Sequence, residues 1–284
     1  MISVNQLTKT YGQKVILDQV SFEIGAGEMV GLIGPNGVGK TTLLSIMMGL
    51  IKADSGTVAI ARIDHRDVNM YRKVGFMQDN TVLYPHLTGY DHLAYVANAH
   101  GLQDEAIERI SLRVGNHAYL HQKVEEYSLG MKQHLLFACA IIHQPDVLLL
   151  DEPFNGLDPT SLIRIRDLII ELSEQQGVTV FLSSHNLDEI DRMTKKIFFL
   201  NNGVIIHKQL QNYEEDQYLL TLDHAVVVDA SQAGVEQINS KQLLVEAVLL
   251  EEVLKHLSGL GVHIQAIDRQ TVGSEKLYRE IYQI

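Results

Sequence analysis

A glycine-rich segment near the start of the chain ends in a lysine and two threonines. Residues 34–42 read GPNGVGKTT and fit the spacing G-x-x-x-x-G-K-[ST]. Glycines let the backbone wrap closely around an anion with successive N–H groups aimed inward. Lys40 would reach the outer phosphates, and the Thr41 hydroxyl would bind Mg²⁺. The predicted phosphate-binding residues are Gly34, Pro35, Asn36, Gly37, Val38, Gly39, Lys40, Thr41 and Thr42.

Two adjacent acids follow an apolar run further along the chain. Asp151 and Glu152 come directly after VLLL, residues 147–150. Asp151 would hold Mg²⁺ through water, and Glu152 would polarise a water that attacks the terminal phosphate. The structural alternative is a pair of acids at a strand end that caps the next helix. The phosphate loop upstream favours the chemical interpretation.

Polar side chains also follow two other apolar runs. His185 comes soon after VTVFL, residues 178–182, and Gln78 comes directly after VGFM, residues 74–77. A histidine in this place can contact the terminal phosphate or the attacking water. A neutral amide can contact both Mg²⁺ and water. A lone histidine after a strand is more often structural, so this prediction depends on its neighbours.

These residues require a parallel sheet to bring them together. Residues 29–33, 74–77, 147–150 and 178–182 are short, continuous apolar runs, as in strands buried on both faces. A helix from Lys40 to about Met48 follows the glycine-rich loop. Ligands bind outside the carboxyl ends of strands in open α/β sheets. The sequence therefore predicts an α/β fold with a phosphate site at this edge.

The segment YSLGMKQH, residues 127–134, carries a second glycine that needs an explanation. Ser128 is a suitable N-cap for a helix. Gly130 is unfavourable within an ordinary helix, where Ala would be more stable. The glycine permits a close approach of the backbone to another group. The alternative is an ordinary capped helix with no ligand.

These motifs, in this order, resemble the ATP-binding subunit of an ABC transporter. Residues 34–41 resemble its P-loop, Gln78 its Q-loop, and Asp151 with Glu152 its Walker-B motif and following glutamate. Asp158 in NGLDP resembles the D-loop aspartate, His185 the switch histidine, and Tyr11 the aromatic residue that stacks on adenine. The resemblance covers about residues 1–210. It implies an ATPase with a P-loop fold, ATP and Mg²⁺ as cofactors, and Glu152, His185 and Gln78 as catalytic residues.

The same resemblance explains YSLGM as the signature motif of that family. It implies that Ser128 and Gly130 of one subunit close over ATP held by the P-loop of a second subunit. Leu129, Met131 and His134 depart from the usual Gly, Gln and Arg. The form SLGM is similar to the signature variant found in exporter-type subunits for drugs, antibiotics and bacteriocins. The partners implied are a second ATP-binding subunit, identical or paralogous, and an integral membrane permease.

Composition limits the other functions. The chain has 284 residues and a net charge of −12, which disfavours binding to a phosphate backbone, so we expect no nucleic-acid partner. It has one cysteine and no apolar run long enough to span a bilayer. We therefore expect a cytoplasmic protein that is peripheral on the membrane through its permease. The alternative is a soluble ABC-type ATPase acting on the ribosome or DNA, and a further one is a module that does not hydrolyse ATP.

Changes in pattern along the chain predict its organisation. Residues 1–210 form the ATPase domain, and residues of about 80–140 form a mostly helical subdomain within it. In the resembled family this subdomain contacts the membrane subunit, and residues 80–93 are the expected contact strip. Tyr84 and Tyr90 would suit an interface if exposed, and core packing is the equal alternative for either one alone. Residues 211–216 form a polar linker. Residues 211–284 form a small α+β accessory domain with a short β/α pattern.

Overall fold

The computed structural model describes residues 1–210, 217–226, 234–270 and 273–284. The chain divides into two compact units, Met1–Lys208 and Gln209–Ile284. The sequence-based boundary lies at 210/211, two residues further on. The predicted linker, residues 211–216, lies outside the described residues. Each unit is described by itself below.

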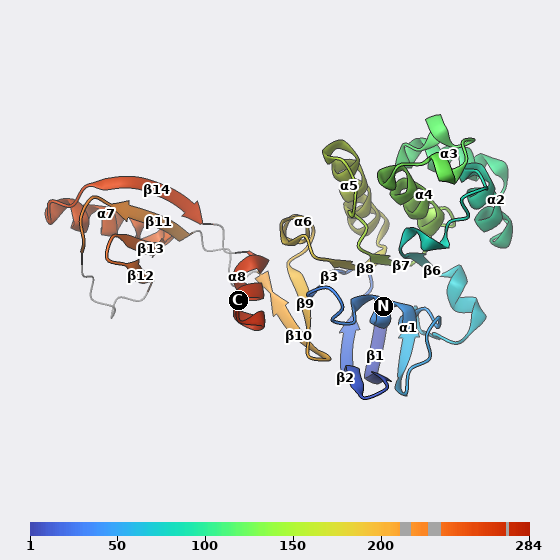
Figure 1. The fold of residues 1–284 in the computed structure, drawn as a ribbon, viewed down its shortest axis with the longest axis horizontal. Helices are drawn as coiled ribbons and strands as arrows, with labels where there is room; N and C mark the ends of the chain where they lie inside the picture. The colour runs from blue at the N-terminus through green and yellow to red at the C-terminus, as the bar shows by residue number, and fades with distance from the viewer. Residues whose placement is uncertain (211–216, 227–233, 271–272) are drawn as a thin grey trace. The chain divides into compact units, whose positions relative to one another are not determined.

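A six-stranded sheet forms the centre of the first unit, in the order β10-β9-β3-β8-β7-β6 (Figure 1). The pairs β3–β8, β3–β9, β7–β8 and β6–β7 are parallel. The inner strands are almost entirely buried, which explains why they read as unbroken apolar runs. The strands are β3 (Met29–Ile33), β6 (Val74–Met77), β7 (Val147–Asp151), β8 (Thr179–Ser184), β9 (Lys196–Asn201) and β10 (Val204–Gln209).

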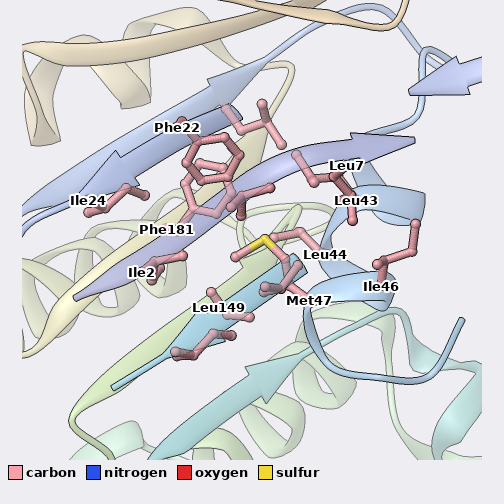
Figure 2. Close-up of a cluster of buried hydrophobic side chains, with 14 of the residues drawn as sticks. Ile2, Leu7, Phe22, Ile24, Leu43, Leu44, Ile46, Met47, Leu149 and Phe181 are labelled. Carbon is pink, nitrogen blue, oxygen red and sulfur yellow. The ribbon is translucent and has the colours of Figure 1, made fainter. Parts of the chain in front are cut away.

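A second, antiparallel sheet has the order β2-β1-β4-β5. Helix α1 (Lys40–Met47) lies between the two sheets (Figure 2). Its Leu43, Leu44 and Met47 are fully buried against residues of both sheets. This core fixes the start of α1 relative to the central sheet. The strands are β1 (Ile2–Tyr11), β2 (Lys14–Ile24), β4 (Ser55–Ile60) and β5 (Ile63–Asp64).

Helices cover the other face of the central sheet. Helices α5 (Pro159–Gln176) and α6 (Leu187–Met193) lie on the face opposite α1 (Figure 1). Gly31 of β3 lies under α6, and a Cβ at this position would collide with Ile190. The sheet is therefore covered on both sides, as the parallel pattern predicted.

Three helices pack together in the predicted helical region, and Figure 1 shows them as one group. They are α2 (Gly89–Ala99), α3 (Asp104–Val114) and α4 (Leu129–Ile141). Thr88 and Asp91 form a capping box at the start of α2. In the expected contact strip, Tyr84 is exposed, as an interface residue would be. Tyr90 is half-buried and stacks on His121, in line with the packing alternative.

The second unit contains an antiparallel sheet in the order β12-β13-β11-β14. Helix α7 (Leu250–Gly259) contributes Leu257 to a core with Leu220, Leu243 and Val245 of the sheet. Its other elements are β11 (Gln217–Leu222), β12 (Val235–Asn239), β13 (Gln242–Glu246), β14 (Ile264–Gln270) and α8 (Ser274–Tyr282). In the described ranges, no helix is both long and apolar enough to cross a bilayer.

Candidate functional site: a nucleotide site at the edge of the central sheet

The glycine-rich loop connects β3 to α1 and leaves the start of α1 open to an anion. Gly39 is the N-cap residue, has φ +119°, and provides no side-chain cap. A Cβ at Gly39 would lie 2.7 Å from Ile16 Cγ2, so a larger residue would also collide. The first turn of α1 contains no acid. The unpaired N–H groups and the helix dipole there are suited to phosphate.

Lys40 is buried at the start of α1, with only 6% of its surface exposed. Its Nζ donates a hydrogen bond to the Gly34 carbonyl at 2.7 Å and lies 3.3 Å from Glu152 Oε1. A buried ammonium needs such partners because desolvation of an unpaired charge is costly. The loop, the first helix and the end of β7 are therefore linked through one side chain.

Glu152 lies just after β7 in a left-handed conformation, with φ +50°. Its backbone N–H donates to Ser183 Oγ at 3.1 Å. Its Oε2 lies 2.7 Å from His185 Nδ1 and accepts a bond from the His185 backbone N–H at 3.2 Å. Glu152 thus contacts both Lys40 and His185. The three residues that sequence reasoning placed on different segments form one chain of contacts.

Asp151 is held by a residue that sequence reasoning missed. The Ser183 hydroxyl donates to Asp151 Oδ1 at 2.5 Å, and both side chains are buried. The same serine oxygen accepts the bond from the Glu152 backbone. Ser183 therefore orients the two predicted acids together. The available signal was the pair of serines in LSSH, small hydroxyl residues at the end of an otherwise apolar strand.

Strand register places the remaining predicted groups on the same edge. Met77 pairs with Leu150, so Gln78 follows its strand at the level of Asp151. Asp151 pairs with Ser183, and Ile33 pairs with Ser184, so the glycine-rich loop begins at the level of His185. Gln78 is half-buried, Thr41 is exposed and Thr42 is half-buried. The four strand ends thus meet at one edge, where parallel strands place ligand sites.

These residues fit Mg²⁺ only together with a phosphate ligand. Among the described residues, no group of three His, Cys, Asp or Glu side chains could hold a metal. Mg²⁺ normally takes one or two protein ligands and completes its shell with phosphate and water. A hydroxyl from Thr41, the carboxylate of Asp151 and the amide of Gln78 suit such a site.

Tyr11 lies at the end of β1 and half of its surface is exposed. The Lys9 ammonium lies 5.1 Å from the centre of its ring, within the range of a cation–π contact. An exposed aromatic ring supported on one side by a cation presents a surface on which a base can stack. This geometry is compatible with the adenine contact predicted for Tyr11.

Ser128 caps the helix α4, where its Oγ accepts a bond from the Met131 N–H at 3.2 Å. The helix begins at Leu129, directly after the N-cap Ser128 that the sequence predicted. Gly130 is therefore the second residue of the helix, where backbone N–H groups have no partner within the helix. The Ser128 proton and this N–H remain suited to a phosphate oxygen.

Gly130 also satisfies a packing requirement within the chain. A Cβ at this position would lie 3.3 Å from the Gly156 carbonyl oxygen, closer than ordinary van der Waals contact. Sequence reasoning attributed this glycine to an incoming phosphate alone. The structure shows a second reason for the glycine, because the loop through Gly156 that leads to Asp158 passes close to Gly130.

Ser128, Gly130 and Asp158 line one pocket of about 360 Å³, which contains no residue of the glycine-rich loop. Asp158 caps α5, accepting bonds from the Thr160 and Ser161 N–H groups and from the Ser161 hydroxyl. These bonds hold the pKa of Asp158 below its usual value, led by the Ser161 hydroxyl. Lys40, Glu152 and His185 thus form one group of contacts, and Ser128, Gly130 and Asp158 form a second group around one pocket.

Comparisons with known proteins identify the family of this chain. The protein-family model described as ABC transporter matches residues 17–155. The ABC transporter ATP-binding protein YdbJ of Bacillus subtilis is 41% identical over 209 residues, which are 72% of this chain and 68% of YdbJ. The chain belongs to the ABC transporter family. The fold and recognition predicted from sequence are thereby confirmed.

Two further matches extend this assignment. The bacitracin transport ATP-binding protein BcrA of Enterococcus faecalis is 35% identical over 226 residues, 76% of this chain and 73% of BcrA. A solved dimer of the ATP-binding cassette MJ0796 in a post-hydrolysis state, bound to ADP and Pi, has a TM-score of 0.67 and 26% identity. It covers 74% of this chain and 99% of MJ0796. As an ABC transporter ATP-binding protein, this chain binds and hydrolyses ATP.

Proposed function

We propose that two copies of the ATPase unit, identical or paralogous, close around two ATP molecules and drive a separate membrane permease. The separation of the two groups of site residues carries this proposal. The pocket beside Ser128 and Gly130 lacks all P-loop residues, so neither group by itself surrounds a nucleotide. Two subunits facing each other would complete both sites. The dimeric form of the similar cassette MJ0796 supports this arrangement.

Each residue of the first group has a proposed task. The P-loop backbone and Lys40 bind the phosphates, and Thr41, Gln78 and Asp151 hold Mg²⁺. Glu152 accepts a proton from the attacking water, and His185 orients Glu152 through the 2.7 Å contact. Tyr11 stacks on adenine. When ATP arrives, Lys40 exchanges its contact with Glu152 for the phosphates, which frees the carboxylate for catalysis.

Ser128 and Gly130 of the facing subunit bind the terminal phosphate, and Asp158 lies beside them. ATP binding then favours the closed pair, and hydrolysis with product release reopens it. A decisive measurement is the mass of the Glu152→Gln chain in solution. We expect Mg-ATP to convert the Glu152→Gln chain from a monomer to a dimer. Adding Ser128→Arg to the same chain should prevent dimerisation. A dimer that is insensitive to Ser128→Arg would contradict the proposed arrangement.

We further propose that the transported cargo is a small molecule or peptide and that the direction is export. The support is the SLGM form of the signature and the similarity to a protein named for bacitracin transport. The chain would then lie on the cytoplasmic face of the cell membrane through its permease. The expected permease contact is the strip at residues 80–93, and the second unit is an accessory domain.

A pull-down tests the permease. The Glu152→Gln chain is purified from native membranes in mild detergent with Mg-ATP, and the associated proteins are identified. A polytopic membrane protein supports the proposal, and its sequence narrows the cargo. Recovery with ribosomes or nucleic acid, without a membrane protein, supports the soluble ATPase instead. The Ser128→Arg chain is the matched control for partners that require the closed pair.

A further inference from the structure

The segment before α4 is attached at several points to the start of α2. The Val124 N–H donates to the Leu87 carbonyl at 2.9 Å, and the Glu125 N–H donates to the Pro85 carbonyl at 2.8 Å. The Tyr90 N–H donates to the Leu120 carbonyl at 2.8 Å. The residues that follow the short 3₁₀ helix His117–Tyr119 are therefore held in place by these hydrogen bonds to the start of α2. Tyr119 is the last residue of this helix.

Tyr127, directly before the signature serine, binds Tyr119. Its hydroxyl donates to the Tyr119 carbonyl at 2.8 Å, and the two rings meet edge to face at 5.1 Å. The Gly89 backbone also forms a hydrogen bond with this hydroxyl, and a Cβ at Gly89 would collide with it. Tyr127 is 5% exposed, and its burial raises the pKa to about 12. Its hydroxyl is therefore a permanent donor.

Tyr119 also binds the other end of the signature segment. Its hydroxyl lies 2.8 Å from Nδ1 of His134, which is in the second turn of α4 and only 8% exposed. Burial, followed by the charge of Arg164, lowers the pKa of His134, whereas Asp158 opposes this shift. Burial raises the pKa of Tyr119 above its usual value. Near neutral pH the pair is therefore an uncharged tyrosine beside an uncharged imidazole.

The direction of this bond follows from the partners available. Within the described part of the chain, no second acceptor is found for the Tyr119 hydroxyl. The Tyr119 hydroxyl therefore donates to Nδ1, and the proton of the neutral His134 ring is on Nε2. In this direction the hydroxyl proton and the Nδ1 lone pair are both used. Nε2 is buried and has no partner among the residues that the structure describes, and His134 lines the pocket beside Ser128 and Gly130. The imidazole is therefore fixed at the wall of the signature pocket.

We propose that Tyr119 is a positioning residue that holds the signature segment at both ends, Tyr127 through its carbonyl and His134 through its hydroxyl. Ser128 and Gly130 lie between these two points. Loss of either contact would let the first turns of α4 shift relative to the facing nucleotide. A displacement of about 1 Å in a positioning group can cost on the order of 100-fold in rate. This inference rests on the proposed two-subunit site.

Three variants each remove a contact, and a fourth restores one. Tyr119→Phe removes the bond to His134 but keeps the ring and the carbonyl that binds Tyr127. Tyr127→Phe removes the bonds of the other hydroxyl. His134→Leu removes the acceptor, and His134→Asn restores a polar atom near the position of Nδ1. Tyr95→Phe is the matched control, because Tyr95 lies on α2 and is 78% exposed.

The readouts are kcat for ATP hydrolysis and the ATP affinity of the monomeric chain, measured at concentrations that do not allow dimerisation. We expect kcat to fall about two- to tenfold in Tyr119→Phe, Tyr127→Phe and His134→Leu, the range of one net hydrogen bond. Monomer affinity should not change, because P-loop residues are untouched. His134→Asn should recover much of the loss. Tyr119→Phe combined with His134→Leu should be no worse than either variant, since they share one bond.

Two results would overturn the inference. The first is a kcat like that of Tyr95→Phe in all three variants. The second is a fall in kcat that is matched by an equal fall in monomer affinity or in the folded fraction, which would indicate general destabilisation. The Ser128→Arg chain distinguishes failure of the proposed function. If Ser128→Arg hydrolyses ATP normally, the proposed signature site itself is wrong. If Ser128→Arg is inactive but the tyrosine variants keep the wild-type kcat, only the role of Tyr119 is contradicted.

Discussion

The Lys40 ammonium and the Glu152 carboxylate lie 3.3 Å apart, and they join the P-loop to the end of β7. The second carboxylate oxygen of Glu152 contacts His185 at 2.7 Å. In this arrangement the predicted catalytic base is paired with the lysine that would bind phosphate. In the proposed mechanism, phosphate would draw Lys40 away from Glu152, and this one contact would thereby link nucleotide binding to activation of the base.

We expect Glu152→Gln to bind ATP but to hydrolyse it at least about 100-fold more slowly, the usual effect of losing a general base. The amide keeps the size of the side chain, but it is a far weaker proton acceptor. Single-turnover phosphate release measures the rate, and nucleotide binding is measured separately. Glu174→Gln, an exposed glutamate of α5, is the control and should match the wild type. A rate for Glu152→Gln within about threefold of the wild type would remove Glu152 from its proposed role.

Ser183→Ala should weaken the response to Mg²⁺ by about 10- to 100-fold, the usual effect of losing a partner that orients a metal ligand. The reason is that Asp151 would lose its 2.5 Å bond to the Ser183 hydroxyl, and the Glu152 backbone N–H would lose the same hydroxyl as an acceptor. The measurement is ATPase activity against Mg²⁺ concentration at saturating ATP. Ser173→Ala, a buried serine in α5, is the control. An unchanged Mg²⁺ midpoint would show that Asp151 needs no such support or holds no metal.

Tyr11→Ala should lower ATP affinity by about 10- to 100-fold, since stacking of a base on an aromatic ring contributes about 1–3 kcal/mol. Tyr11→Phe should bind ATP normally because the ring remains. Binding of inorganic tripolyphosphate, which has no base, should be equal in all three proteins. Calorimetry can measure each affinity. An equal loss for tripolyphosphate in Tyr11→Ala would mean that the residue acts on the phosphate loop and not on adenine.

Protonation of His143 should lower the free energy of unfolding of the first unit in acid. Burial, followed by the charge of neighbouring His100, lowers its pKa to about 4 from 6.5, and a bond to the Val74 carbonyl opposes this shift. The unfolded chain therefore binds a proton more readily. This contribution to stability is complete above pH 6.5 and is lost as the pH falls towards 4. We expect a loss of about 1–2 kcal/mol after allowing for partial exposure.

The measurement is thermal unfolding of the wild type and His143→Leu between pH 7 and pH 4. The acid-dependent loss should be smaller in His143→Leu. His86→Leu is the control, because His86 is exposed in the expected contact strip. The rings of His100 and His143 stack at 4.0 Å, and burial, followed by the charge of Arg72, lowers the pKa of His100. An identical pH dependence in wild type and His143→Leu would show that another group dominates.

The sequence by itself determined the central strands and the position of the nucleotide loop. Val74–Met77 and Met29–Ile33 have the predicted bounds, because strands buried on both faces must be continuously apolar. Residues 34–42 were recognisable because phosphate binding requires glycine, lysine and threonine at fixed local spacing. The capping role of Ser128 was also local, since an N-cap is defined by the residues next to it.

Only the tertiary structure decided which distant side chains support these motifs. Ser183 contacts Asp151 and Glu152 across two neighbouring strands, and Tyr119 contacts Tyr127 and His134 from a separate short helix. Periodicity reports which face of an element is buried, but it does not report which residue of another element lies opposite. The contact between Gly130 and Gly156 was missed for the same reason. Such contacts depend on strand register and helix packing, which arise when the whole chain folds.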